Sequence, residues 1–276
     1  MDVSQAEYWN EQAGPVWVDL NQVLDAQVEP LGAPAMAMLA LKAGETVLDI
    51  GCGCGQTSWQ LAQAVGSEGA VEAVDLSAPM LAVARARTPI AGAARPRFRQ
   101  ADAETDALGA GFDAAFSRFG VMFFPRPAAA FANIRRAVKP GGRLAFVCWR
   151  SVAENPMMRA PAEAAAPFLP PSPPTDPHEP GPFAFADGER TRGLLAEAGW
   201  ADVAVRPADI PVGGQPLEGA TDLALRIGPL GAAVRRDPAL AEKVRPAVRA
   251  GLEGYVASGK VWFPAAVWMV SARNPG

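Results

Sequence analysis

The fold is decided by residues 47–62, which read VLDIGCGCGQTSWQLA. An apolar strand ends at Asp49 and Ile50, three glycines (Gly51, Gly53 and Gly55) form a turn, and a helical pattern follows. Glycine suits this turn because it adopts positive φ and lets a ligand approach the backbone closely. The stretch therefore predicts a strand–loop–helix unit with a ligand site at the loop.

Short strands and helices alternate outward from this stretch, over residues 42–150. The sequence predicts strands at 45–50, 70–76, 97–103, 112–120 and 143–149, and helices at 56–65, 77–87 and 128–138. Ser77 is the expected N-cap of its helix, and KPGG at 139–142 is expected to end the last one. Alternation at this spacing predicts an α/β protein with a parallel sheet covered on both faces.

The flanking segments have a different texture. Residues 1–41 are expected to form an N-terminal helical cover, and residues 183–276 to complete the sheet with a helix at 185–200 and strands at 201–207 and 265–272. Residues 217–258 read as two short helices broken at Pro229, Pro238 and Pro246.

Residues 151–182 are expected to form a Pro-rich cover loop. Positions 156–182 hold ten prolines, which we take to be too many for a helix or an interior strand. This segment leaves the carboxyl end of the fifth strand, so it is expected to shape a second ligand pocket within one catalytic domain.

Two acidic residues indicate which ligand the glycine loop takes. Asp75 ends the second strand, 24 residues after Gly51, where a carboxylate can accept hydrogen bonds from ribose hydroxyls. The loop lacks the Gly-Lys-Ser/Thr of a phosphate-binding loop, and its G-x-G-x-G departs from the dinucleotide pattern G-x-G-x-x-G. Asp49 would repel a phosphate but can hold an ammonium group.

At this point the chain resembles class I S-adenosylmethionine-dependent methyltransferases. The resemblance rests on four motifs in the family's order: VLDIGCGCG (47–55), AVDLSAPML (73–81), RQADAE (99–104) and VKPGGRLAF (138–146). Two further stretches, SRFGVMFFPRP (117–127) and FVCWR (146–150), are similar to bacterial small-molecule enzymes related to the ubiquinone/menaquinone C-methyltransferases. The resemblance implies a Rossmann-like, seven-stranded, mostly parallel sheet with helices on both faces, N-terminal helices and a helical or loop cover.

The resemblance also implies a cofactor, S-adenosyl-L-methionine, and a first set of binding residues. Gly51 and Gly53, with Cys52 between them, would let the backbone approach the methionine part of the cofactor. Asp49 would orient the loop or bind the amino group, and Asp75 would bind the ribose.

A second set of residues would complete the cofactor site. Leu76 and Met80 would pack against adenine, whereas Asp102 and the backbone amide of Ala103 would hydrogen-bond to it. Ser117 would lie near the methionine moiety. Aromatic residues of the first helices, Trp17 with Tyr8 and Trp9, would cover the cofactor.

Each of these roles has a plainer alternative. Leu76 and Met80 suit simple core packing, Asp102 suits a helix N-cap, and the N-terminal aromatics suit packing of the first helix on the sheet. His178 is the only histidine and a weak candidate for a catalytic base, against a solvent-facing loop residue. Arg118 suits either an anionic substrate group or an ion pair with an acid.

Composition excludes several classes of function. The net charge is −4 and the arginines are scattered apart from Arg95, Arg97 and Arg99, so no nucleic-acid partner is expected. No stretch has the 18 or more apolar residues of a membrane helix, and the amino terminus lacks a signal-peptide pattern. Cys52 and Cys54 are spaced for neither a disulfide framework nor zinc, so we expect reduced thiols in a cytoplasmic protein and no metal site.

The function expected from these patterns is methyl transfer from S-adenosylmethionine to O, N or C of a small molecule, by a monomer or homodimer. A non-catalytic sensor or scaffold that binds S-adenosylmethionine is one alternative. An NAD(P)-dependent oxidoreductase is another, which preferential binding of a nicotinamide cofactor would favour.

Overall fold

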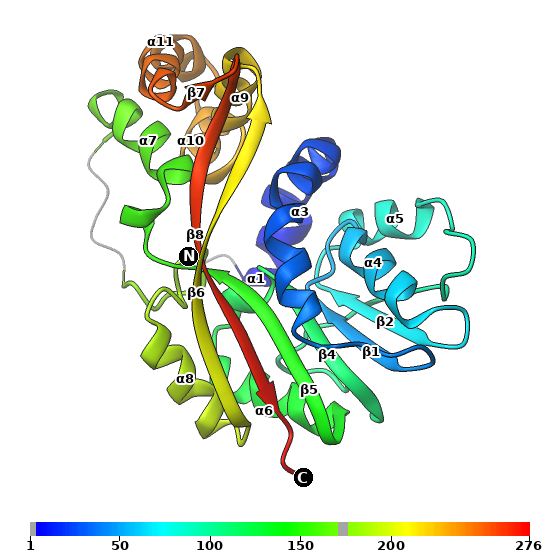
Figure 1. The fold of residues 1–276 in the computed structure, drawn as a ribbon. Coiled ribbons are helices and arrows are strands. Elements are labelled where there is room, and N and C mark those ends of the chain that lie inside the picture. The colour runs from blue at the N-terminus through cyan, green and yellow to red at the C-terminus, as the bar shows by residue number, and fades with distance from the viewer. Residues whose placement is uncertain (1–3, 171–175) are drawn as a thin grey trace.

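A single mixed sheet forms the centre of the computed structural model, which describes residues 4–170 and 176–276 (Figure 1). Its strand order is β3-β2-β1-β4-β5-β8-β6, with β8 antiparallel to β5 and β6 and the remaining neighbours parallel. The strands are β1 (Thr46–Ile50), β2 (Ala70–Asp75), β3 (Arg97–Gln100), β4 (Phe112–Arg118), β5 (Val138–Trp149), β6 (Ala201–Gln215) and β8 (Lys260–Arg273). The expected seven-stranded, mostly parallel α/β sheet is confirmed, with a two-residue strand β7 (Val256–Ala257) added beside β8.

Helices cover both faces of this sheet. Figure 1 shows α3, α4 and α5 on one side and α6 and α8 on the other. The helices are α1 (Gln5–Glu7), the π-helical η1 (Tyr8–Gln12), α2 (Ala13–Asp19), α3 (Asn21–Ala37), α4 (Gln56–Val65), α5 (Ala78–Ala86), α6 (Pro127–Ala137), α7 (Pro156–Ala165), α8 (Gly188–Glu197), α9 (Leu217–Ala224), α10 (Gly228–Arg236) and α11 (Ala239–Glu253). The three-residue 3₁₀ turns are η2 (Val121–Phe123), η3 (Val152–Glu154) and η4 (Ala166–Phe168).

Local sequence signals place several helix ends. The Ser77 side chain accepts a hydrogen bond from the amide of Met80, as predicted for an N-cap, and Pro79 occupies the first turn of α5. Asp187 caps α8 in the same way. Gly199 follows α8 with φ of 84°, so its freedom at positive φ ends that helix.

The glycine loop follows β1 at the point where the strand order reverses. β1 pairs with β2 on one side and β4 on the other, and their carboxyl ends meet at one edge of the sheet. Ligands of open α/β sheets bind at such an edge, where the connections on the two sides lead to opposite faces. The topology therefore brings the ends of β1, β2 and β4 together as a candidate site.

The two prolines of α7 did not prevent a helix, so the expectation of a loop over this whole segment is wrong. Pro156 occupies the first turn, where no intrahelical donor is lost, and Pro161 costs a single bond. Pro161 is buried, and α7 packs against α11. This packing outweighs the cost of the proline, while residues 171–175 of the same Pro-rich segment lie outside the described residues.

Residues 217–253 form three helices rather than the expected two. Pro229 lies in the first turn of α10 and Pro238 is the N-cap of α11, so both mark helix starts. Pro246 was expected to break a helix but lies inside α11, whose buried face includes Val244 and Val248. The apolar face of α11 therefore persists through the proline.

Boundaries of four strands also differ from the sequence expectation. β3 ends at Gln100, short of Asp102. β5 begins at Val138, so that KPGG both ends α6 and forms an irregularity at which the pairing with β4 shifts. β6 and β8 are about twice as long as expected, pairing as far as Gln215 and Val261 after β5 has ended at Trp149. Helices α9–α11 and strand β7 connect β6 to β8, and we call this long antiparallel pair the β6–β8 hairpin. Figure 1 shows it rising past the sheet, with α7, α9, α10 and α11 around its far end.

Candidate cofactor and acceptor site

The glycine loop closes tightly on its own neighbours. Gly51 has φ of 65°, and a Cβ built on it would lie 2.7 Å from the Cα of Gly120, which follows β4. The amides of Gly51 and Cys52 both donate to the carbonyl of Val74 at the end of β2, at 2.9 and 3.1 Å. Glycine is thus required at position 51 by backbone contact as well as by φ. The loop joins the ends of three neighbouring strands.

Asp49 lies fully buried beneath this loop. Its Oδ2 accepts hydrogen bonds from the hydroxyls of Thr57 at 2.8 Å and Ser58 at 2.7 Å, both in the first turns of α4. Its Oδ1 is buried and has no hydrogen-bond partner among the described residues. Burial raises the pKa of Asp49 from 3.8 to about 6, against the lowering effect of the two hydroxyls. A cation beside Oδ1 would satisfy this oxygen and favour the charged form.

Asp75 connects the glycine loop to the start of α5. Its Oδ2 accepts from the amide of Gly53 at 2.7 Å, and its Oδ1 from the amide of Ser77 at 2.8 Å. Burial raises the pKa of this carboxyl, and the backbone amides lower it. The side chain is partly exposed, and each carboxylate oxygen can accept a second hydrogen bond. A ligand with vicinal hydroxyls can therefore bind without displacing the loop.

The residues expected around adenine lie at the ends of β2 and β3. Met80 is 5% exposed and its Cε lies 2.9 Å from the position of a Cβ on Gly53, while Leu76 is partly exposed. Asp102 is partly exposed and its Oδ1 accepts from the amide of Glu104 at 2.8 Å, which is a turn cap rather than the cap of a described helix. Ala103 is buried beside it. The structure brings these four residues to the same edge as Asp75.

The end of β4 brings a strained residue next to the glycine loop. Ser117 is fully buried; its hydroxyl donates to the carbonyl of Ile50 at 2.8 Å and accepts from the amide of Gly120 at 3.2 Å. Phe119 has φ of 61°, and its ring stacks on Trp149 with centroids 4.3 Å apart. Sequence reasoning did not single out Phe119, because nothing in SRFG indicates a left-handed aromatic residue. Backbone strain of this kind concentrates at functional sites.

The N-terminal helices dock on the β2–α5 connection. The Asn10 side chain donates to the carbonyl of Leu76 at 2.9 Å and accepts from the amide of Ala78, and the Ser77 hydroxyl donates to the carbonyl of Trp9. Trp17 packs edge-on against Trp9, with ring centroids 6.1 Å apart. The aromatic residues therefore lie beside the candidate cofactor edge.

Trp17 also belongs to an apolar contact between the N-terminal helices and α9. Leu20, Leu24 and Leu223 form its buried centre; Val16, Trp17, Val23 and Ile227 pack around them. We call this cluster the seam. It joins segments that are about 200 residues apart in the sequence.

Arg118 takes the plainer of its two expected roles, an ion pair, and the cysteines are buried in the core. Arg118 pairs with Asp25 of α3 at 3.1 Å, and Asp25 also contacts Arg87. Cys52 packs with Ala73 and Leu81, and burial raises its pKa well above the ordinary value. The same cause raises the pKa of Cys54 to about 12. The three cysteines are free and buried as thiols.

His178 lies in the segment between η4 and α8, which contacts η2 through a hydrogen bond from the Gly181 amide to the Met122 carbonyl at 3.1 Å. His178 is exposed, and its backbone amide donates to Asp176 at 2.8 Å. Its role as a base stays a prediction. Among residues 4–170 and 176–276 no group of three or more His, Cys, Asp or Glu is arranged to hold a metal ion, and no helix is long and apolar enough to span a bilayer.

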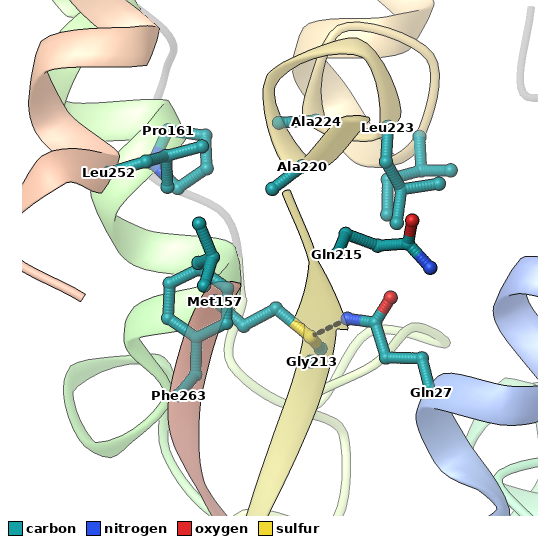
Figure 2. A pocket seen from close by; sticks show the side chains of 12 residues that line it. Gln27, Met157, Pro161, Gly213, Gln215, Ala220, Leu223, Ala224, Leu252 and Phe263 are labelled. Carbon is teal, nitrogen blue, oxygen red and sulfur yellow. Dashed lines mark hydrogen bonds between the residues drawn. The ribbon is translucent and has the colours of Figure 1, made fainter. Parts of the chain in front are cut away.

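A narrow, partly open pocket with a cavity volume of about 30 Å³ lies between α3 and the far end of the β6–β8 hairpin (Figure 2). Its lining is apolar apart from two glutamines, and none of the described residues that line it is charged. The lining residues are Gln27, Met157, Pro161, Gly213, Gln215, Ala220, Leu223, Ala224, Ile227, Leu252, Val261 and Phe263. Leu223 and Ile227 belong also to the seam, so the pocket adjoins the N-terminal cover.

Comparison with known proteins agrees with this architecture. Residues 47–142 match the family model described as "Methyltransferase domain". The matched residues include residues 47–50 of β1, the glycine loop and β4, so the match confirms the resemblance predicted from the sequence.

Three similar proteins are informative. Aklanonic acid methyltransferase DauC of Streptomyces sp. (strain C5) is 34% identical over 143 residues, or 51% of this chain and 60% of DauC. The ubiquinone/menaquinone biosynthesis C-methyltransferase UbiE of Cellvibrio japonicus is 38% identical over 106 residues, or 38% of this chain and 43% of UbiE. The match therefore spans less than two thirds of either relative.

The third is the structure of Haemonchus contortus phosphoethanolamine N-methyltransferase 2 with S-adenosylhomocysteine and phosphomonomethylethanolamine. It superposes with a TM-score of 0.60 at 18% identity, covering all of this chain and 61% of that one. At this identity the likeness shows a shared fold.

Proposed function

We propose that this protein transfers the methyl group of S-adenosylmethionine to a small-molecule acceptor. The observation that carries the proposal is the pair of carboxylates around the glycine loop: Asp49, with one buried oxygen unpaired, and Asp75, partly exposed. An ammonium fits the first and ribose hydroxyls fit the second, and S-adenosylmethionine carries both groups. Curated relatives named as small-molecule methyltransferases support the proposal.

Different residues are proposed to bind different parts of the cofactor. In the proposed complex, Asp49 orients the glycine loop and attracts the ammonium group from beneath it, Asp75 binds the ribose, and the loop Gly51–Gly53 lies against the methionine part. Leu76, Met80, Asp102 and Ala103 surround the adenine, Ser117 closes the methionine end, and Trp17 covers the site. The sulfonium of the bound cofactor supplies an activated methyl group, so the protein's own task is alignment and exclusion of water.

The acceptor is proposed to bind on the side of the N-terminal cover opposite the cofactor. The pocket beside α3 is apolar apart from two glutamines, and α7, α9 and α11 line it together with the hairpin. Phe119 and Trp149 form an apolar edge at the ends of β4 and β5. Residues 1–41 and 151–182, with the helices inserted into 183–276, would act as the cover, and residues 42–150 as the cofactor-binding core of one catalytic domain.

The proposal includes a setting for this reaction. Free, buried thiols suit a reducing compartment, so the protein is expected to act in the cytoplasm. A small molecule rather than nucleic acid or a membrane is the expected partner, and the protein is expected to act as a monomer or homodimer.

Thermal shift with separate ligands tests the cofactor. S-Adenosylhomocysteine is expected to raise the melting temperature, and NAD is expected to leave it unchanged; stabilisation by NAD alone would overturn the proposal. Incubation with methyl-labelled S-adenosylmethionine and candidate acceptors then separates an enzyme from a sensor. A sensor would bind the cofactor and transfer label to no acceptor.

A further inference from the structure

Gln27 is the one side chain of the acceptor pocket that is both buried and polar. It lies on α3, is 6% exposed, and its Oε1 has no hydrogen-bond partner among the described residues. Its Nε2 contacts the sulfur of Met157, which is a weak acceptor. Figure 2 shows the amide between Met157 and Gln215, inside the pocket.

The docking of α3 does not explain this amide. Val28, Leu31 and Ala35 pack the helix into the main core, and Leu24 packs it into the seam. An apolar residue at position 27 would continue that face without leaving a polar atom unsatisfied. A buried carbonyl oxygen without a partner is destabilising, so a donor is expected beside it: a water molecule in the free protein, which the hydroxyl of a bound ligand can replace.

The rest of the pocket restricts what that ligand can be. Met157, Leu223, Leu252 and Phe263 present hydrocarbon or sulfur, and the described lining offers no charged side chain. A charged ligand would lose its hydration there without gaining a counter-charge. An uncharged, mainly apolar ligand would keep the benefit of burial.

We propose that Gln27 is a specificity-determining residue that accepts a hydrogen bond from a hydroxyl of an uncharged, largely apolar acceptor. The unpaired atom is a carbonyl oxygen, so its partner must be a donor. A site built around a hydrogen bond discriminates against an analogue that lacks the hydroxyl, because the buried oxygen then stays unpaired. This inference rests on the proposed function, since it assigns the chemistry of that acceptor pocket.

The test uses 1-naphthol and its near-isosteric analogue 1-methylnaphthalene, titrated calorimetrically into protein saturated with S-adenosylhomocysteine. Wild type is expected to bind 1-naphthol about tenfold more tightly, a ratio that corresponds to ~1.4 kcal/mol. Gln27→Leu is expected to bind the two compounds equally. The matched control is Gln22→Leu, an exposed glutamine on the same helix, which is expected to keep the preference.

Melting temperature provides a readout of folding in the same experiment. Gln27→Leu removes an unpaired polar group, so it is expected to melt no lower than wild type; Gln27→Met repeats the test with a flexible side chain if the leucine variant does not fold. A preference for 1-naphthol that survives both substitutions, or its absence in wild type, would overturn the inference. Failure of S-adenosylhomocysteine to bind in the separate thermal-shift measurement would instead count against the proposed function.

Discussion

Asp49 is a buried carboxylate with one unpaired oxygen, so its ionisation links stability to pH. Its pKa is about 6 in the folded protein and about 3.8 when unfolded. Between these values the folded chain keeps a proton that the unfolded chain has lost. The contribution of Asp49 to stability therefore falls as pH rises through this window and stays low above it. The full effect is about 3 kcal/mol by linkage.

Asp49→Asn removes this effect. The variant is expected to be more stable than wild type at pH 7 by up to about 3 kcal/mol, and the advantage is expected to disappear near pH 4. Urea unfolding of both proteins across this range measures the difference. A variant that is less stable than wild type at pH 7 would show that the ionised carboxylate is already satisfied in the free protein.

The same residue predicts how cofactor affinity depends on pH. An ionised Asp49 is needed to pair with an ammonium group, so wild-type affinity for S-adenosylhomocysteine is expected to fall as pH drops below about 6. Asp49→Asn is expected to bind more weakly at pH 7 and to lose this pH dependence. Calorimetric titrations at pH 5 and 7 measure both. Equal pH dependence in the two proteins would remove Asp49 from the ammonium site.

Asp75 combines a ligand role with a structural one. Asp75→Ala is expected to weaken S-adenosylhomocysteine binding by ~1.5–3 kcal/mol, because a charged acceptor is lost. It also leaves the amides of Gly53 and Ser77 without their partner, so some loss of stability is expected. Asp75→Asn keeps one oxygen acceptor, so its affinity for S-adenosylhomocysteine is expected to lie between those of wild type and Asp75→Ala. Glu68→Ala, which removes an exposed carboxylate, serves as the control. Unchanged calorimetric affinity in a folded Asp75→Ala protein would contradict the ribose assignment.

At the scale of the element, the glycine loop depends on backbone contact. Gly51→Ala is expected to cost about 3 kcal/mol: ~1 from positive φ and about 2 from overpacking against Gly120, whose Cα would lie 2.7 Å from the new Cβ. Gly44→Ala is the matched control, because Gly44 also has positive φ (83°) but nothing lies within 4 Å of its Cβ position. It is expected to cost only ~1 kcal/mol.

Chemical denaturation measures both variants, and cofactor titration separates loop damage from a general loss of stability. S-Adenosylhomocysteine affinity is expected to fall in Gly51→Ala and to stay unchanged in Gly44→Ala. Equal costs in the two variants would mean that the Gly51–Gly120 contact relaxes freely and does not shape the site.

Prolines explain why the core elements were predictable and those of the cover were not. In the core, the glycine loop after β1, Asp75 at the end of β2 and the Ser77 cap are local signals, and they agree with the fold. In the cover, Pro161 and Pro246 lie inside helices because α7 and α11 bury apolar faces against each other, which is a tertiary effect. Pro207 and Pro211 lie on β6, at the edge of the sheet, where a missing donor is tolerated. Ending the strand at Pro207 therefore placed the end of β6 too early.

At the scale of the whole molecule, the cofactor residues could be predicted from the sequence, whereas the residues of the acceptor pocket could not. Asp49 and the glycines stand in one motif and Asp75 ends the next predicted strand, so the sequence could place them together. The acceptor pocket draws residues from α3, α7, the hairpin, α9 and α11, which only the tertiary fold assembles. Gln27 is one of several glutamines in a helical segment, and its sequence context has no feature that marks it as buried.

The seam joins the N-terminal helices and α9 into a single cover over the edge where the carboxyl ends of β1, β2 and β4 meet. Its centre is Leu20, Leu24 and Leu223, and Trp17 links it through Trp9 to the Ser77 connection beside Asp75. Elements that share a buried apolar contact open together when that contact is weakened. We therefore expect the two sides of the cover to open as one unit.

Leu20→Ala tests this expectation, because Leu20 is in the seam but does not line the pocket. Loss of its side chain is expected to cost roughly 2–3 kcal/mol and to speed amide hydrogen exchange in residues 13–24 and 217–236 together, with the amides of β1 and β4 unchanged. Leu240→Ala, at a buried position of α11 outside the seam, is expected to affect 228–253 and to leave 13–24 as in wild type. Exchange measured by mass spectrometry distinguishes these patterns. If Leu20→Ala sped exchange in 13–24 alone, α9 would be held by the hairpin and α11 rather than by the seam, and the two sides of the cover would open independently.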